Sequence, residues 1–302
     1  MNKKALEMSF NWIFAIIVGA VILFLAIYFV GKIISTGRYQ QDSLVAKELS
    51  SLTNPLGTGF AETSKAVIDL KLDTRIFNDC SSVGNFGKSI LSATTRSGIG
   101  KEWGDKGVEQ ELQSKYIFSE KVEEGKKLYV FTREFNMPFY VSDIMVFTSK
   151  NYCFINIPYD FENEFVNINA GNLKVGNCTL SDIQVCFNQD CDISIDTYEQ
   201  SVTKNGSKVY YTGELIYAAI FSDKETYECN IKRLMKRISH LTLIYQDKID
   251  IINEMCFSGL GPELQGLDSM AKSLNSSIDL GQVESSAFAL DYKNDYAGCQ
   301  LY

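Results

Sequence analysis

Residues 10–30 constrain this chain more than any other stretch, because 21 consecutive residues carry no charge. A helix of this length rises roughly 30 Å, about the thickness of the hydrocarbon core of a bilayer. It shows no polar face, and Trp12 and Tyr28 lie near its ends, where aromatic rings favour the headgroup level. The sequence therefore predicts a transmembrane helix over residues 10–34, preceded by a short basic leader over residues 1–9.

A cleaved secretory signal is the alternative interpretation of these residues. The apolar part of such a signal usually spans about 7–15 residues and leads to a small-x-small cleavage site. Here the apolar stretch is longer, and it continues through Tyr28, Phe29 and Val30 without such a site. The pattern favours a retained anchor.

The cysteines bear on the orientation of the chain, because all eight follow the apolar stretch. An even number on one side of a membrane favours an oxidising compartment. We therefore expect the N-terminus in the cytoplasm and the C-terminal domain outside, anchored in the cell membrane by a single span. We also expect disulfides that include Cys186 and Cys191, with the pairing left open. The disulfide candidates are Cys80, Cys153, Cys178, Cys186, Cys191, Cys229, Cys256 and Cys299.

The leader gives a family resemblance. Lys3-Lys4-Ala5 is followed by Leu6-Glu7-Met8-Ser9-Phe10, which runs directly into the apolar helix. This N-terminus resembles archaeal type IV pilin-like proteins with a class III signal peptide, although Ala5-Leu6 replaces the usual glycine or alanine followed by glutamine. The resemblance covers about residues 1–34. It implies that a membrane peptidase removes the leader with Lys3 and Lys4, and that the apolar helices then pack together in a filament core or platform.

The apolar stretch also carries small residues on nearly one face, at Ala15, Gly19 and Ala26. Transmembrane helices associate through close contact at such residues. The resemblance implies a further contact, in which Glu7 meets a neighbour's N-terminal amine after processing. The expected partners are the membrane and, through this helix, further copies or related subunits.

Beyond the helix the chain is acidic. Removing residues 1–34 takes away three lysines and one glutamate, which leaves 26 basic and 36 acidic side chains and a formal charge of −10. This balance argues against nucleic acid as a partner. With 45% hydrophobic and 12% aromatic residues, the chain has enough apolar side chains to form a core.

The remaining pattern predicts an α+β fold. A membrane-proximal helix is expected over residues 35–56 and an extracytoplasmic domain over 57–302. Short runs rich in aromatic and β-branched residues predict an antiparallel meander, and Asn205-Gly206 predicts a tight hairpin turn. Glycines among serines and threonines predict a loop or flap over residues 78–107. The expected strands lie at residues 66–72, 128–131, 139–141, 144–147, 152–155, 165–168, 182–187, 192–196 and 208–221.

The period changes to that of a helix after residue 221. Apolar residues from Tyr227 to Ile252 recur every three or four positions, and Pro262 is well placed to begin a second helix. We expect the two helices to form an antiparallel hairpin against the sheet. Two subdomains divided near residue 160 are the weaker alternative.

Signals for chemistry are sparse, and no catalytic, metal or cofactor site is assigned. His240 is the only histidine in the chain, and we expect it on the polar face of its helix. The cysteine spacing favours disulfides over zinc, and residues 188–192 favour a solvated turn over a calcium loop. Gly84-Asn85-Phe86-Gly87-Lys88-Ser89 does not have the spacing of a phosphate-binding loop.

Two surface features complete the pattern. Lys232, Arg233, Lys236 and Arg237 form a basic cluster, expected to be a solvated face paired with Glu228, with a contact surface as the alternative. The glycosylation candidates, each in an Asn-x-Ser/Thr sequon, are Asn177, Asn205 and Asn275.

The sequence thus favours a non-enzymatic, single-pass envelope protein, most simply a pilin-like or surface-assembly component. An anchored extracellular binding module, such as an adhesin or receptor without filaments, is the main alternative. A hydrolase that uses Asp143, or Asp160 with Glu162, is a third, because acid-base pairs need no motif.

Overall fold

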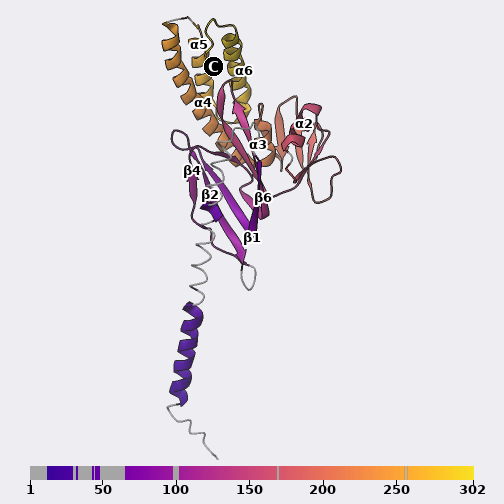
Figure 1. Ribbon diagram of the computed structural model, residues 1–302. Helices are drawn as coiled ribbons and strands as arrows, with labels where there is room; N and C mark the ends of the chain where they lie inside the picture. Colours follow the sequence, from indigo (N-terminus) through magenta and orange to yellow (C-terminus); the bar gives the residue numbers. More distant parts are fainter. Residues whose placement is uncertain are drawn as a thin grey trace, which may run out of the picture.

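The computed structural model describes residues 12–29, 32, 43, 45–47, 65–97, 102–168, 170–254, 256 and 258–302. The apolar helix Trp12–Phe29 stands apart from a body of strands and helices (Figure 1). The leader residues Lys3, Lys4 and Glu7 lie outside the described residues, as does most of the predicted helix 35–56. The fold class is α+β, as predicted.

The strands described here form two sheets, and the first contains most of the long strands. Its order is β3-β2-β1-β6-β7-β5, with β4 paired to β2. The neighbours are antiparallel except for β5 and β7, which are parallel. The strands are β1 (Lys65–Ser81), β2 (Lys88–Ser97), β3 (Glu102–Trp103), β4 (Gln110–Leu112), β5 (Tyr116–Phe118), β6 (Val122–Asn136) and β7 (Tyr140–Thr148).

The second sheet has the order β13-β12-β11-β10-β8-β9. Its strands are β8 (Tyr152–Ile155), β9 (Leu173–Val175), β10 (Ile183–Phe187), β11 (Ile193–Asp196), β12 (Ser201–Lys204) and β13 (Ser207–Tyr210). The chain changes sheets after β7, and β8 lies parallel to both of its neighbours. The predicted continuous antiparallel meander is therefore wrong at this point. Helix α2 (Tyr159–Ile168) replaces the strand expected over residues 165–168.

Helix α3 (Leu215–Phe221) joins the sheets and is buried along its whole length. The predicted strand 208–221 is correct only as far as Tyr210, where β13 ends. The ring of Phe221 lies 5.4 Å from Phe131 of β6 and 4.7 Å from Tyr152 of β8, measured between ring centroids. One hydrophobic core thus continues from the first sheet to the second, which argues against a division near residue 160.

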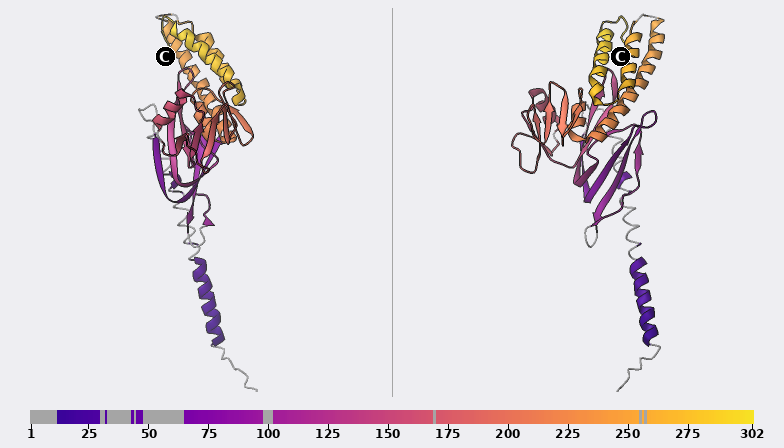
Figure 2. Two further views of the ribbon diagram at one scale, coloured as in Figure 1. Left: turned by 90° about the vertical axis from the view of Figure 1, so that its right-hand side faces the viewer. Right: turned by 180° about the vertical axis from the view of Figure 1, so that it is seen from behind.

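The C-terminal part is helical, with α4 (Lys224–Asn253), α5 (Gly261–Ser273), the 3₁₀ turn η1 (Ser277–Asp279) and α6 (Leu280–Asp295). The carboxylate of Asp223 caps α4 by accepting a hydrogen bond from the backbone N–H of Thr226 at 2.8 Å. Pro262 lies in the first turn of α5, as predicted. The sequence predicted a hairpin of two helices here, but α6 follows as a further helix, and Figure 2 shows it beside α4 and α5.

The predicted loop over residues 78–107 is largely β-structure. Strand β1 continues to Ser81, and a short turn leads into β2, which pairs with β1 from Asp73 to Ser81. Gly84 and Gly87 in this turn have φ of 84° and 59°, a region that glycine adopts without strain. Gly84 and Gly87 therefore mark a hairpin turn and not a flap, while Gly98 and Gly100 lie outside the described residues.

Candidate functional site

The apolar helix is the first functional element. Trp12–Phe29 has a mean hydropathy of 2.8, and none of its 18 residues is buried. Among the described residues it is the one helix that is long and apolar enough to cross a membrane. Ala15, Gly19 and Ala26 are exposed, and a Cβ added at Gly19 would meet no atom within 4 Å. The small-residue face is therefore open to a neighbouring helix.

All eight cysteines lie in the described residues, and they form four disulfides. The prediction that Cys186 and Cys191 are cross-linked is confirmed, and they pair with each other. Cys80–Cys229 connects the end of β1 to α4 across 149 residues of sequence. The other pairs are Cys153–Cys178 and Cys256–Cys299.

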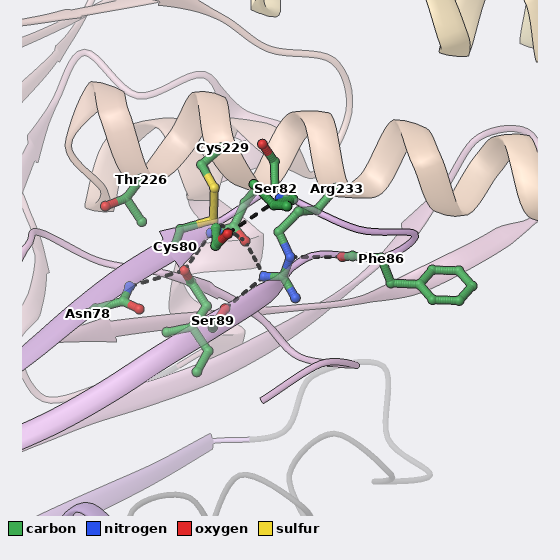
Figure 3. The surroundings of a disulfide bond; sticks show 12 residues. Asn78, Cys80, Ser82, Phe86, Ser89, Thr226, Cys229 and Arg233 are labelled. Carbon is green, nitrogen blue, oxygen red and sulfur yellow. Dashed lines mark hydrogen bonds between the residues drawn. A yellow bond between two sulfur atoms is a disulfide. The ribbon is translucent and has the colours of Figure 1, made fainter. Parts of the chain in front are cut away.

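Arg233 lies beside the Cys80–Cys229 disulfide and reaches toward the first sheet (Figure 3). Its side chain is fully buried. Its guanidinium donates hydrogen bonds to the carbonyl oxygen of Phe86 at 3.1 Å and to the hydroxyl of Ser89 at 2.8 Å. It also donates to Asn230 Oδ1 at 2.7 Å and to the carbonyl oxygen of Gln113 at 3.0 Å. Arg233 is thus a structural link between α4 and the sheet.

Two other members of the basic cluster make similar contacts. Lys236 donates to the carbonyl oxygens of Ser82 and Gly84 at 2.6 and 2.8 Å, and Arg237 donates to the carbonyl oxygen of Val141. The predicted solvated face is therefore wrong for Arg233, Lys236 and Arg237, because α4 lies against the sheet through this part of its surface.

The expected partner of the cluster has a different role. The carboxylate of Glu228 accepts hydrogen bonds from the backbone N–H and the hydroxyl of Ser277, at 2.8 and 2.6 Å. Glu228 therefore fastens η1 to α4, and the predicted pairing with the basic cluster is wrong. Within the cluster, only Lys232 has an exposed side chain.

A cavity of about 410 Å³ adjoins this junction, between α4, the last turn of α5 and the β1–β2 turn. Lys232, Lys236 and Lys272 line it together with His240, and none of its lining residues is acidic. His240 is half-buried, with its ring 4.7 Å from that of Phe86. The sequence predicted a polar-face histidine but gave no sign of this cavity, because its walls come from distant segments.

The three sequon asparagines Asn177, Asn205 and Asn275 are exposed. The predicted Asn205-Gly206 turn is confirmed, with φ of 51° and 70° between β12 and β13. The hydroxyl residues that complete two of these sequons are already engaged in hydrogen bonds. Thr179, in the sequon of Asn177, donates to Asp182 at 2.7 Å, and Ser277, in the sequon of Asn275, is buried and donates to Glu228. Glycosylation at these positions stays a prediction.

The carboxylates considered for a hydrolase lie in two elements. Asp143 lies on β7 of the first sheet, where burial raises the pKa of its carboxyl, whereas Asp160 and Glu162 both lie in α2, beyond β8. Residues 188–192 form a turn in which Asp192 accepts from the backbone N–H of Gln184 at 2.9 Å. In the part of the chain that the structure describes, no group of three or more His, Cys, Asp or Glu side chains is placed to hold a metal ion.

Comparison with known proteins adds no relative. No known protein family, curated protein or solved structure matches this chain. The resemblance of residues 1–34 to pilin-like proteins therefore stays a prediction. The features of the structure that bear on function are the apolar helix, the disulfides and the basic cavity.

Proposed function

We propose that this chain is a single-pass membrane protein that displays its disulfide-bonded α+β domain outside the cell and assembles, in the manner of a pilin-like component, through its membrane helix. The observation that carries the proposal is the apolar helix Trp12–Phe29, which buries no residue against the domain. An apolar surface of this length is stable in a bilayer and costly in water. The proposal assigns no catalytic role.

The disulfides support the outward orientation. All eight cysteines follow the helix and are paired. Thiols in a reducing cytosol seldom form such bonds, whereas extracytoplasmic domains retain them. On intact cells, a membrane-impermeant maleimide added after an impermeant phosphine reductant should label the domain. A domain that is labelled only after cell lysis contradicts the orientation.

Assembly through the helix follows from the physics of packing in lipid. Lipid solvates an apolar helix as well as another helix does, so association depends on close contact at small residues. Ala15 and Gly19 are four positions apart, and the face that carries them is exposed. We therefore expect contact between copies, or with related subunits, at this face.

The substitution Gly19→Leu tests assembly. It adds bulk to the proposed contact and should lower the association constant, measured by cross-linking at several protein densities in membranes, by roughly fivefold, about 1 kcal/mol. Ala20→Leu is the matched control, because it adds bulk about 100° around the helix, outside that face. If the wild type is monomeric, or if the two substitutions weaken association equally, the helix serves only as a membrane anchor and the assembly proposal is wrong.

The second candidate function is an anchored extracytoplasmic binding module that acts without assembly. The cavity beside α4 favours it, since three lysines and a histidine line this space in a chain of net charge −8. The two candidate functions can be tested separately, because ligand binding depends on this cavity and assembly depends on the membrane helix.

A further inference from the structure

The positive charge inside the cavity beside α4 is only partly neutralised by neighbouring groups. Lys272 pairs with Asp268 at 2.7 Å, which balances its charge. Lys236 is bonded to the carbonyl oxygens of Ser82 and Gly84, which are dipoles without formal charge. Lys232 is exposed, and the structure places no carboxylate within ion-pairing distance of it among the residues it describes. The cavity thus presents two uncompensated ammonium groups.

The rest of the lining can complete a binding site. His240 and Asn85 offer polar groups from α4 and the β1–β2 turn, while Met235, Ala271 and Leu274 provide an apolar surface. A cavity of about 410 Å³ is larger than a simple ion requires. It has room for an anionic group attached to a small organic remainder.

The cavity is also fixed before any ligand arrives. The Cys80–Cys229 disulfide joins the end of β1 to α4. Arg233 donates to the carbonyl oxygen of Phe86 at 3.1 Å, and Lys236 donates to that of Ser82 at 2.6 Å, so the β1–β2 turn is fastened to the helix near both of its ends. Binding to such a site loses little free energy to the ordering of loops.

The charge of the donors indicates which anion fits. A lysine ammonium acts as a point charge, so it selects an anion by charge and not by planar geometry. Two such ammonium groups match a phosphate monoester, which carries a charge of about −1.5 to −2 at neutral pH, better than a carboxylate with its single charge. Arg233 and Arg237 do not line the cavity, and they donate to protein oxygen atoms in the neighbouring junction. Lys236 donates to two carbonyl oxygens, which leaves one of its three N–H donors for a ligand. The groups left to a ligand are lysine ammoniums on α4, with the imidazole of His240 beside them.

We propose that this cavity binds the tetrahedral oxyanion, phosphate or sulfate, of a small organic ligand. The inference rests on the second candidate function, the anchored binding module, and is independent of assembly through the membrane helix. Lys232 and Lys236 supply the charge, and Met235 and Leu274 contact the organic remainder. Glycerol phosphate from a lipid headgroup and a soluble sugar phosphate share this chemistry.

Calorimetric titration of the full-length protein in uncharged detergent micelles tests the proposal. Glucose 6-phosphate, glycerol 1-phosphate, sodium phosphate and sodium sulfate are the probes, and glucose and sodium acetate are the controls. We expect saturable binding of the oxyanions at low ionic strength, with a dissociation constant on the order of 1 mM. Tighter binding of glucose 6-phosphate than of glycerol 1-phosphate assigns a soluble sugar phosphate, and the reverse order assigns a lipid headgroup.

Lys232→Gln should weaken phosphate binding by about tenfold, the effect of losing one charge-assisted contact. Lys126→Gln removes the same charge from an exposed position on β6 and should leave binding unchanged. Circular dichroism confirms that both variants fold, which is expected because both side chains are exposed. The Gly19→Leu variant should bind phosphate normally, so that loss of assembly and loss of binding are distinguished.

Three outcomes overturn the proposal. The first is that none of the oxyanions binds saturably, and the second is that acetate binds as well as phosphate. The third is that Lys232→Gln and Lys126→Gln weaken binding equally, which would show that phosphate responds only to the net charge of the protein. None of these results bears on assembly, which Gly19→Leu tests separately.

Discussion

The guanidinium of Arg233 is held by oxygen atoms from separate segments that carry no formal charge. Phe86 belongs to the β1–β2 turn, Ser89 to β2, and Gln113 follows β4, while Asn230 lies one turn earlier on α4. The guanidinium also lies 4.7 Å from the ring centre of Tyr116. Burial lowers the pKa of Arg233 to about 10, so the side chain stays protonated at neutral pH.

Because the oxygen atoms around Arg233 lie in different directions, we expect its shape to matter more than its charge. Arg233→Met should lower the free energy of unfolding by about 3 kcal/mol, since it leaves buried acceptors without donors. Arg233→Lys keeps the charge but loses the planar fork, and should cost nearly as much. Urea unfolding of both variants measures these values, with Lys126→Met as the surface control.

A lysine at position 233 that restores most of the stability would contradict this prediction, because charge alone would then be sufficient. An unchanged stability in Arg233→Met would show that water replaces the lost donors. Either result would show that the hydrogen bonds of the Arg233 guanidinium are not needed to hold α4 against the first sheet.

The sequence could not assign this role to Arg233. It shows four basic residues near the start of a helix, where cations interact unfavourably with the helix dipole. Several of their acceptors are backbone carbonyls of residues more than 90 positions away, including Val141 and Phe86. A backbone carbonyl has no signature in a sequence, so the cluster could only be predicted to be a solvated face or a contact surface.

Elements with a clear period were predicted well. Helix α4 has its apolar residues at helical spacing, and β10 and β11 lie within the strands expected over residues 182–187 and 192–196. The Asn205-Gly206 turn was predicted because both residues tolerate positive φ. In each case the signal lies within a few neighbouring residues, which is the range over which sequence patterns are informative.

Elements without such a signal were missed for two reasons. Helix α3 is buried on every side, so its continuous apolar run has the same appearance as a strand. Strand β2 carries polar residues at buried positions, including Ser92 and Thr94, which are typical of loops. The hydroxyl of Thr94 donates to the carbonyl oxygen of Gly104 at 2.8 Å, so the fold provides a partner that the sequence pattern does not reveal.

Helix α6 was missed because both of its faces are apolar. Leu280, Val283 and Leu290 are buried, while Phe288 and Tyr292 are exposed on the opposite side. An element with apolar residues all around has a weak helical period. The C-terminal region was therefore assigned one helix too few.

At the scale of the whole molecule, the core connects the two sheets and the C-terminal helices. Helix α3 lies between the sheets, and the C-terminal residues return to the first sheet, where Leu301 is fully buried. The ring of Tyr302 lies 5.6 Å from that of Phe139, beside the turn between β6 and β7. We therefore expect the domain to unfold as one cooperative unit.

Phe221→Ala tests this expectation, because its ring contacts Phe131 of the first sheet and Tyr152 of the second. Removing a buried phenylalanine ring typically costs about 3–5 kcal/mol. In a Trp12→Phe background the fluorescence of Trp103 reports on the first sheet, and far-ultraviolet circular dichroism reports mainly on α4, α5 and α6. If the core is continuous, Phe221→Ala shifts both unfolding transitions to lower urea by the same amount, whereas the exposed Tyr198→Ala shifts neither. Transitions that separate in the wild type, or a shift seen by one probe alone, would show that the sheets and helices unfold as independent units.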